Sequence, residues 1–253
     1  FDVYILDYKG LDLNTPILTT QGFKFLKDIT KEDIIFDKDG KETRIKNISE
    51  IHNNPCYKII FDSGEEIIAD HEHRWLISFR KGTGKYQEKV LTTEELKESL
   101  DLYKEKKNAY YLPKIINTKP LDRKDVDLPI DPYILGYWLG DGTSVAGSIT
   151  AENENFWKEV ENRGYKYGED ISGINRTELR TIFGLRTQLN NLNLINNKHI
   201  PNCYLLASYN QRLELLRGFM DADGYYNSKR KRFVMATTRE YQADYLVTLL
   251  ATL

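Results

Sequence analysis

The sequence predicts a multidomain protein whose first half is all-β and whose second half mixes helices and strands. Three observations support this division. Short alternating runs separated by glycine-containing turns fill residues 16–77. A helical segment over 134–142 returns in related form over 216–224. The composition is ordinary for a globular protein, with 40% hydrophobic and 29% charged residues, and 253 residues are enough for two cores.

Turn signals justify the strands of the first half. The Asp-Gly at 39–40 and the Ser-Gly at 63–64 each stand between β-branched and aromatic residues, a pattern typical of hairpins. Turns recur at intervals of roughly 10–12 residues, which favours a sandwich or barrel-like domain. One helix interrupts the strands, because Thr92 and Glu95 fit a capping box at the start of TTEELKESLDLYKEK.

Two related helices organise the second half. ILGYWLGDG over 134–142 aligns with LRGFMDADG over 216–224, and each segment ends in a glycine, which predicts a left-handed helix stop. Small residues four positions apart leave one face of each helix nearly bare, so the pair can pack closely. Asp141 and Asp223 would then lie side by side, and their repulsion calls for a divalent cation. Oxygen ligands favour Mg²⁺ or a similar hard ion.

Composition also bounds the setting of the protein. Cys56 and Cys203 lie far apart and form no C-x-x-C, so we expect a reducing, cytoplasmic environment. No apolar run approaches ~18 residues, and the N-terminus lacks a secretory pattern, so neither a membrane partner nor secretion is expected. The net charge of -2 leaves nucleic-acid binding to local basic patches.

The two helical segments resemble the motifs of LAGLIDADG homing endonucleases in their two-motif, single-chain form. The resemblance covers residues 121–253 and implies an α/β domain of αββαββα repeats, the second incomplete. In that family the last acid of each motif binds the catalytic metal, which carries over to Asp141 and Asp223 with Mg²⁺ as cofactor. Lys198, in a K-x-I-P context, would polarise the attacked phosphate or tune the attacking water.

The same resemblance implies a double-stranded DNA target. Its expected contacts are the basic tip of the strand-like run RKRFVMATT and three arginines of the first repeat. These candidates are Lys229, Arg230, Lys231, Arg232, Arg176, Arg180 and Arg186.

Two segments of the first half, GLDLNTPILTTQGFKFLKDI and SGEEIIADHEHRWL, resemble the opening and second blocks of an intein, a self-splicing Hint domain. The resemblance covers residues 10–120 and makes residues 1–9 an N-extein remnant. His73 matches the histidine that polarises the amide before Gly10, while the usual Thr three residues earlier is Asp70 here. Gly10 occupies the position of the nucleophile and supplies none, so splicing is expected to be blocked.

These resemblances imply an intein-encoded, metal-dependent homing endonuclease with a Hint domain. Gly10 is then either a replacement that traps the precursor or a sign that a downstream nucleophile attacks directly. The implied partners are the intein-less host gene as double-stranded DNA, flanking exteins and a C-terminal intein fragment. Two alternatives stay open: a decayed endonuclease that only binds DNA, and a splicing element whose inserted domain is a scaffold.

Overall fold

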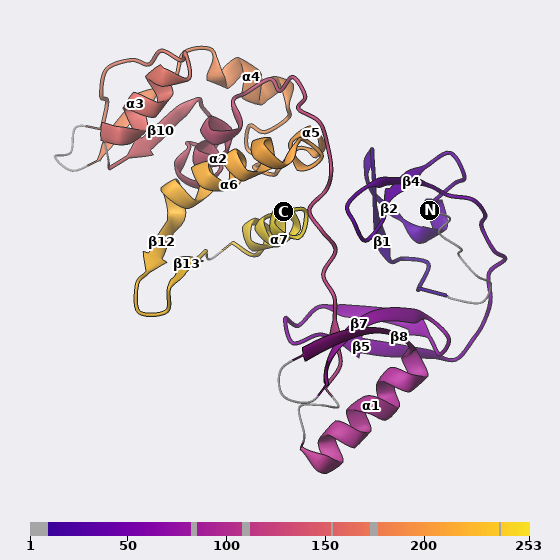
Figure 1. Cartoon of the computed structure of the whole chain (residues 1–253). Coiled ribbons are helices and arrows are strands. Elements are labelled where there is room, and N and C mark those ends of the chain that lie inside the picture. The colour runs from indigo at the N-terminus through magenta and orange to yellow at the C-terminus, as the bar shows by residue number, and fades with distance from the viewer. Residues whose placement is uncertain (1–9, 82–84, 108–111, 153, 173–176, 238) are drawn as a thin grey trace. The chain divides into compact units, whose positions relative to one another are not determined.

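The computed structural model describes residues 10–81, 85–107, 112–152, 154–172, 177–237 and 239–253. The chain forms two compact units, Phe1–Thr118 and Lys119–Leu253, which we call unit 1 and unit 2 (Figure 1). Each unit buries its own set of apolar side chains.

The described residues of unit 1 form three antiparallel sheets, with strand orders β2-β1-β3-β4, β5-β6 and β8-β7-β9. The strands are thus grouped in small separate sheets, and one helix follows β8. The elements are β1 (Pro16–Thr19), β2 (Gly22–Phe25), the 3-10 turn η1 (Leu26–Asp28), β3 (Ile34–Phe36), β4 (Glu42–Arg44), β5 (Cys56–Ile60), β6 (Glu66–Asp70), β7 (Arg74–Lys81), β8 (Lys85–Thr92), α1 (Thr93–Lys106) and β9 (Lys114–Ile115).

The capping box of α1 is confirmed. The Thr92 side chain accepts from the Glu95 amide, and the Glu95 side chain accepts from the Thr92 amide. This exchange satisfies donors that the first turn of a helix leaves open. The helix then packs against the sheets through Leu96, which belongs to a buried cluster with Ala69, Trp75, Ile77 and Leu91.

Unit 2 alternates helices with short strands. Within its described residues the strands form two antiparallel pairs, β10-β11 and β12-β13. The elements are α2 (Pro132–Asp141), β10 (Ser148–Ala151), α3 (Glu154–Asn162), β11 (Glu178–Thr181), α4 (Leu185–Asn191), α5 (Asn202–Leu205), α6 (Tyr209–Asp223), β12 (Gly224–Asn227), β13 (Arg232–Met235) and α7 (Glu240–Ala251).

The starts of α2 and α6 follow from sequence. Asp131 caps α2 by accepting from two amides of the first turn, and a proline occupies the first helical position. Ser208 and Gln211 form a capping box at the start of α6. Both helices therefore begin where local hydrogen bonding replaces the missing helical partners.

The expected close packing of α2 on α6 is confirmed, and glycine makes it possible. A Cβ added at Gly136 would stand 2.0 Å from the carbonyl oxygen of Leu215. A Cβ added at Gly218 would stand 2.0 Å from the carbonyl oxygen of Tyr133. Because these neighbours are backbone atoms, neither can move aside without shifting a helix.

The expected left-handed stops of these helices are wrong. Gly142 has φ -76 and Gly224 has φ -97, so both continue as extended chain. Space, rather than backbone handedness, explains these glycines. A Cβ at Gly142 would lie 2.2 Å from a ring carbon of Trp138, and one at Gly224 would lie 2.3 Å from the end of Met220.

One buried arginine ties together three segments of unit 2. Arg212 is fully buried, and its guanidinium donates to the carbonyl oxygens of Leu121 and Thr252 at 2.9 Å and to that of Ala207. The Leu121 amide in turn donates to the Thr252 carbonyl at 3.0 Å. Burial, with the charge of Arg123, lowers the pKa of Arg212 to about 10.

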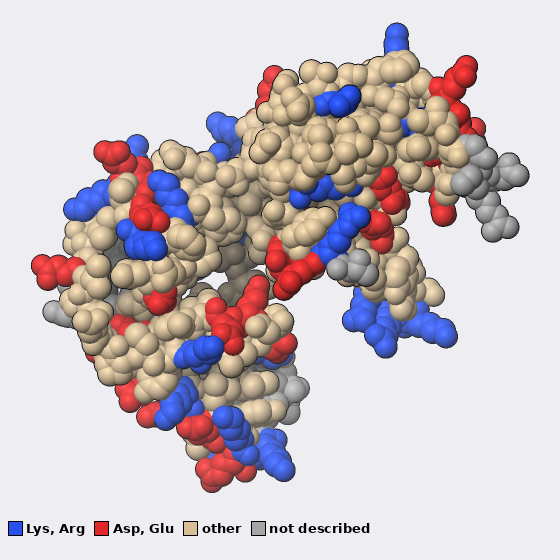
Figure 2. All heavy atoms as spheres, turned by 180° about the vertical axis from the view of Figure 1, so that it is seen from behind, with Lys and Arg blue, Asp and Glu red and all other residues tan. Residues whose placement is uncertain are grey.

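The β12–β13 hairpin projects from unit 2 (Figure 1), and Lys and Arg side chains gather at its end (Figure 2). Its loop is closed by the amide of Arg230, which donates to the side-chain oxygen of Asn227 at 3.0 Å. Lys231 adopts φ 48, which completes the tight turn.

Replacing Gly136 by alanine should destabilise unit 2 strongly, because the new methyl group meets backbone rather than a movable side chain. We expect a loss of about 2 kcal/mol or more in the free energy of unfolding, measured by urea denaturation. Gly168→Ala is the matched control, since its Cβ would meet the Phe183 ring at an ordinary 3.6 Å. Equal stability of both variants would contradict the tight contact.

Candidate cation and nucleic-acid site

The two acids of the repeated segments stand where α2 and α6 end. Asp141 is the last residue of α2 and Asp223 the last of α6. A Cβ on Gly140 would lie 2.6 Å from that of Ala222 and 3.1 Å from Oδ2 of Asp223. The Asp223 carboxylate therefore lies against the backbone one residue before Asp141, and the structure brings the two acids together.

This proximity changes the electrostatics of Asp141. Burial, the larger cause, and the negative charge of Asp223 raise the pKa of Asp141 to about 6, while Lys198 acts in the opposite direction. Burial and the charge of Asp223 both disfavour the ionised form of Asp141. An acid pair of this kind is stabilised by a proton or by a cation that takes the proton's place.

Lys198 lies at the same helix end but is held by backbone. Its Nζ donates to the carbonyl oxygens of Leu139 at 3.1 Å, Gly140 at 3.2 Å and Gly142 at 2.7 Å. It also lies 4.8 Å from the centroid of the Trp138 ring. The ammonium thus caps the last carbonyls of α2, where a cation is favoured by the helix dipole.

Burial is also the largest cause of the pKa shift of Lys198. Burial and the charge of Arg239 lower the pKa of Lys198 to about 8, against the opposing charges of Asp223 and Asp141. The lysine is consequently close to losing its charge at moderately alkaline pH.

Sequence reasoning missed Gln242, a buried side chain on α7. Its Nε2 donates to Oδ2 of Asp223 at 3.3 Å, and its Oε1 accepts from the Thr237 hydroxyl at 2.5 Å. A lone glutamine in a helix carries no signal in the sequence, because its importance depends on how α7 docks. The contact ties the Asp223 carboxylate to α7.

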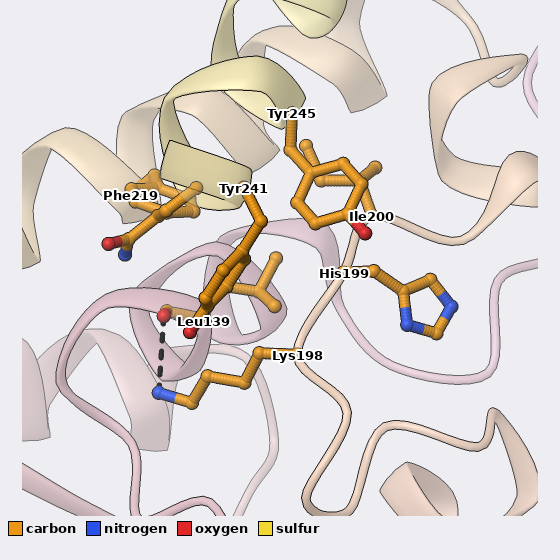
Figure 3. Close-up of a pocket in the computed structure, with 8 residues that line it drawn as sticks. Leu139, Lys198, His199, Ile200, Phe219, Tyr241 and Tyr245 are labelled. Atoms are coloured by element: carbon orange, nitrogen blue, oxygen red, sulfur yellow. Dashed lines mark hydrogen bonds between the residues drawn. The ribbon is translucent and has the colours of Figure 1, made fainter. Parts of the chain in front are cut away.

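An apolar pocket lies beside the acid pair, and Figure 3 shows Lys198 at its edge reaching the Leu139 carbonyl. The lining comes from α2, α6, α7 and residues 198–200. It comprises Leu139, Lys198, His199, Ile200, Phe219, Tyr241, Gln242 and Tyr245.

The residues of the acid pair fit the expected hard cation. In the part of the chain that the structure describes, no group of three or more His, Cys, Asp or Glu side chains gathers as a complete metal cage. Mg²⁺ needs no such cage, because it usually keeps several waters and binds through one or two carboxylates and a phosphate. Asp141 and Asp223 can supply those carboxylates.

The basic residues of the hairpin are free for an anionic partner. Lys229, Arg230, Lys231 and Arg232 are all exposed, and none forms an ion pair with another described residue. Four adjacent cations at a projecting tip repel one another, and binding of a polyanion would relieve that repulsion. We refer to residues 229–232 as the basic tip.

The arginines of the first repeat lie differently. Arg180 donates to Glu178 at 2.9 Å and stacks near the rings of Tyr167 and Trp157, so its charge is already compensated. Arg186 is exposed in the first turn of α4. Arg176 lies outside the described residues.

The candidate residues of unit 1 are partly assembled. Asp70 is 2% exposed and its Oδ2 accepts from the Gly10 amide at 2.8 Å and from the Asn54 side chain at 3.1 Å. His73 packs edge-on against Trp75, with ring centroids 4.7 Å apart. The structure therefore brings Gly10 and Asp70 together.

No family model matches the chain. Among curated proteins it is 33% identical over 232 residues to the replicative DNA helicase DnaB of Mycobacterium intracellulare, which covers 85% of this chain and 38% of that protein. It is 27% identical over 260 residues to the ATP-dependent DNA helicase Hel308 of Methanocaldococcus jannaschii, covering 93% of the chain and 20% of the helicase. A 72-residue stretch is 35% identical to DnaB of Mycobacterium leprae, covering 28% of the chain and 12% of that protein. The chain thus spans well under half the length of these relatives.

These relatives correct the functional interpretation of the sequence. Their names are those of DNA helicases, and none is named as an intein or a homing endonuclease. The family assignment, and with it the expected DNA cleavage and protein splicing, is contradicted. The resemblance rested on four short motifs, whereas two of these alignments cover 85% and 93% of the chain.

No helix in the described residues has the length and apolar character needed to cross a membrane.

Asp141 should make stability depend on pH. Its folded pKa of about 6 lies above the ordinary value of 3.8, so the folded state keeps a proton that the unfolded chain releases. Stability from this group is present below pH 4 and is lost as pH rises through 6. In metal-free buffer, Asp141→Asn and the wild type should have equal free energies of unfolding near pH 4. At pH 7 the variant should be more stable by about 1–2 kcal/mol, since solvent screens part of the effect at this half-exposed group.

Urea denaturation from pH 4 to pH 8 measures this difference. Asp244→Asn changes an exposed carboxylate on α7 and serves as the control. A wild type that is more stable than Asp141→Asn at pH 7 without metal would rule out an uncompensated acid pair.

Proposed function

We propose that this chain is a DNA-binding region of a protein related to DNA helicases. The observation that carries the proposal is the β12–β13 hairpin, which holds four exposed, unpaired cations at its tip. Cations of this kind bind phosphates and release counterions from DNA. The helicase names of the relatives agree with a DNA partner.

The proposal assigns DNA contact to these residues and leaves nucleotide hydrolysis aside. The 253-residue sequence contains no G-x-x-x-x-G-K-[ST] run, the pattern that cradles the phosphates of a nucleotide in many ATPases.

We further propose that a divalent cation, with Mg²⁺ as the natural candidate, binds between Asp141 and Asp223. Asp223 directly precedes β12, so the cation would lie at the base of the hairpin that contacts DNA. The raised pKa of Asp141 supports this site, because a cation relieves the repulsion that causes part of the shift. The bound ion would supply positive charge toward a DNA phosphate, and Gln242 would hold the Asp223 carboxylate in place.

Removing the basic tip should weaken DNA binding. We expect the combined replacement of Lys229, Arg230, Lys231 and Arg232 by glutamine to reduce affinity at least tenfold. It should lower the salt slope by up to about 3.6, since each of the four lost phosphate contacts removes ~0.9. Fluorescence anisotropy with labelled DNA between 50 and 200 mM KCl measures both quantities.

The matched control neutralises three exposed lysines in another cluster, Lys104, Lys106 and Lys107 at the end of α1. This variant should bind DNA as the wild type does. Equal losses in both variants would show nonspecific charge attraction and would contradict a dedicated hairpin contact.

Mg²⁺ should stabilise the protein through the acid pair. Adding MgCl₂ at tenfold its dissociation constant should contribute about 1.4 kcal/mol, visible as a rise in Tm. Asp141→Asn and Asp223→Asn should each abolish the rise, whereas Asp244→Asn should keep it. Calorimetric titration with MgCl₂ at constant ionic strength gives the affinity directly, and a rise in Tm that survives in both acid-pair variants would place the ion elsewhere.

A further inference from the structure

The hairpin carries a second feature that phosphate binding does not explain, an exposed pair of aromatic rings. Tyr226 in β12 lies directly opposite Phe233 in β13, with ring centroids 5.1 Å apart. The two side chains are 54% and 72% exposed. Residues paired across antiparallel strands share one face, so both rings stand on the same side of the hairpin.

The position of this aromatic pair relative to the charges points to its ligand. Phe233 is the immediate neighbour of Arg232, and the basic tip closes the same hairpin. At ~3.3 Å per strand residue, the rings lie within about 10 Å of the charged loop. A partner that fits must therefore offer anionic groups and flat apolar faces at short spacing.

Single-stranded DNA has this chemistry, because unpaired bases expose their faces while the phosphates remain accessible. Basic grooves combined with aromatic platforms are the usual means of holding such strands. A duplex presents its phosphates but keeps its bases stacked inside, and reaching them requires unstacking at a cost of a few kcal/mol. The rings would thus contribute to binding of a single strand and little to binding of a duplex.

We propose that the β12–β13 hairpin binds single-stranded DNA, with unstacked bases on Tyr226 and Phe233 and phosphates on the basic tip. This inference rests on the proposed DNA binding and specifies the form of DNA bound. The shape of the hairpin supports this assignment. Its tight loop, closed by the Asn227 side chain and by the left-handed backbone of Lys231, holds the two strands in register and keeps the rings beside the charges.

The test compares two labelled probes of the same sequence, one single-stranded and one duplex, by fluorescence anisotropy at 100 mM KCl. The wild type should bind the single strand at least fivefold more tightly. Tyr226→Leu combined with Phe233→Leu keeps apolar side chains but removes the ring faces. This variant should lose about tenfold or more in affinity for the single strand and change duplex affinity by less than twofold.

Two controls separate stacking from folding and from charge. Tyr225→Leu changes an aromatic ring on the opposite face of the hairpin, 55% exposed, and should leave single-strand affinity unchanged. An abasic oligonucleotide of equal length should bind the wild type as weakly as the intact single strand binds the double-leucine variant. Circular dichroism melting of each variant establishes that unit 2 stays folded.

The outcomes distinguish this inference from the proposal on which it rests. Equal or tighter binding of duplex by the wild type, or full single-strand affinity in the double-leucine variant, overturns the single-strand inference while DNA binding stands. Binding of neither probe by the folded wild type overturns both.

Discussion

Backbone contact between α2 and α6 is the constraint on which unit 2 depends. Gly136 and Gly218 allow each helix to rest directly on a carbonyl of the other. Helices that approach this closely cannot slide or rotate independently, so their ends are fixed relative to each other. The positions of Asp141 and Asp223 are consequently a property of the helix pair rather than of flexible loops.

That rigidity creates an electrostatic problem at the shared helix end. Carboxyl ends of helices carry partial negative charge, and here two such ends each add a carboxylate. Lys198 offsets part of this negative charge by donating to the carbonyl oxygens of Leu139, Gly140 and Gly142 at the end of α2. The carboxylates themselves remain close together, and burial together with the charge of Asp223 raises the pKa of Asp141. A positive charge is therefore favoured at the shared end of α2 and α6.

Sequence reasoning succeeded where the signal was local and periodic. The small residues four apart predicted the close helix pair, and Thr92 with Glu95 predicted a helix start. The predicted left-handed stop at Gly142 was wrong, because sequence alone cannot distinguish a glycine required for space beside Trp138 from one required for a left-handed turn. Sequence reasoning could not find Gln242, whose contact with Asp223 depends on the docking of α7. The functional interpretation failed because short motifs were weighed without the rest of the chain.

Arg212 has a topological consequence for unit 2. By donating to the carbonyl oxygens of Leu121, Ala207 and Thr252, its guanidinium joins segments that lie far apart in the sequence. Loss of this side chain would remove a donor from all three carbonyls, so the packing of these segments depends on a single buried charge.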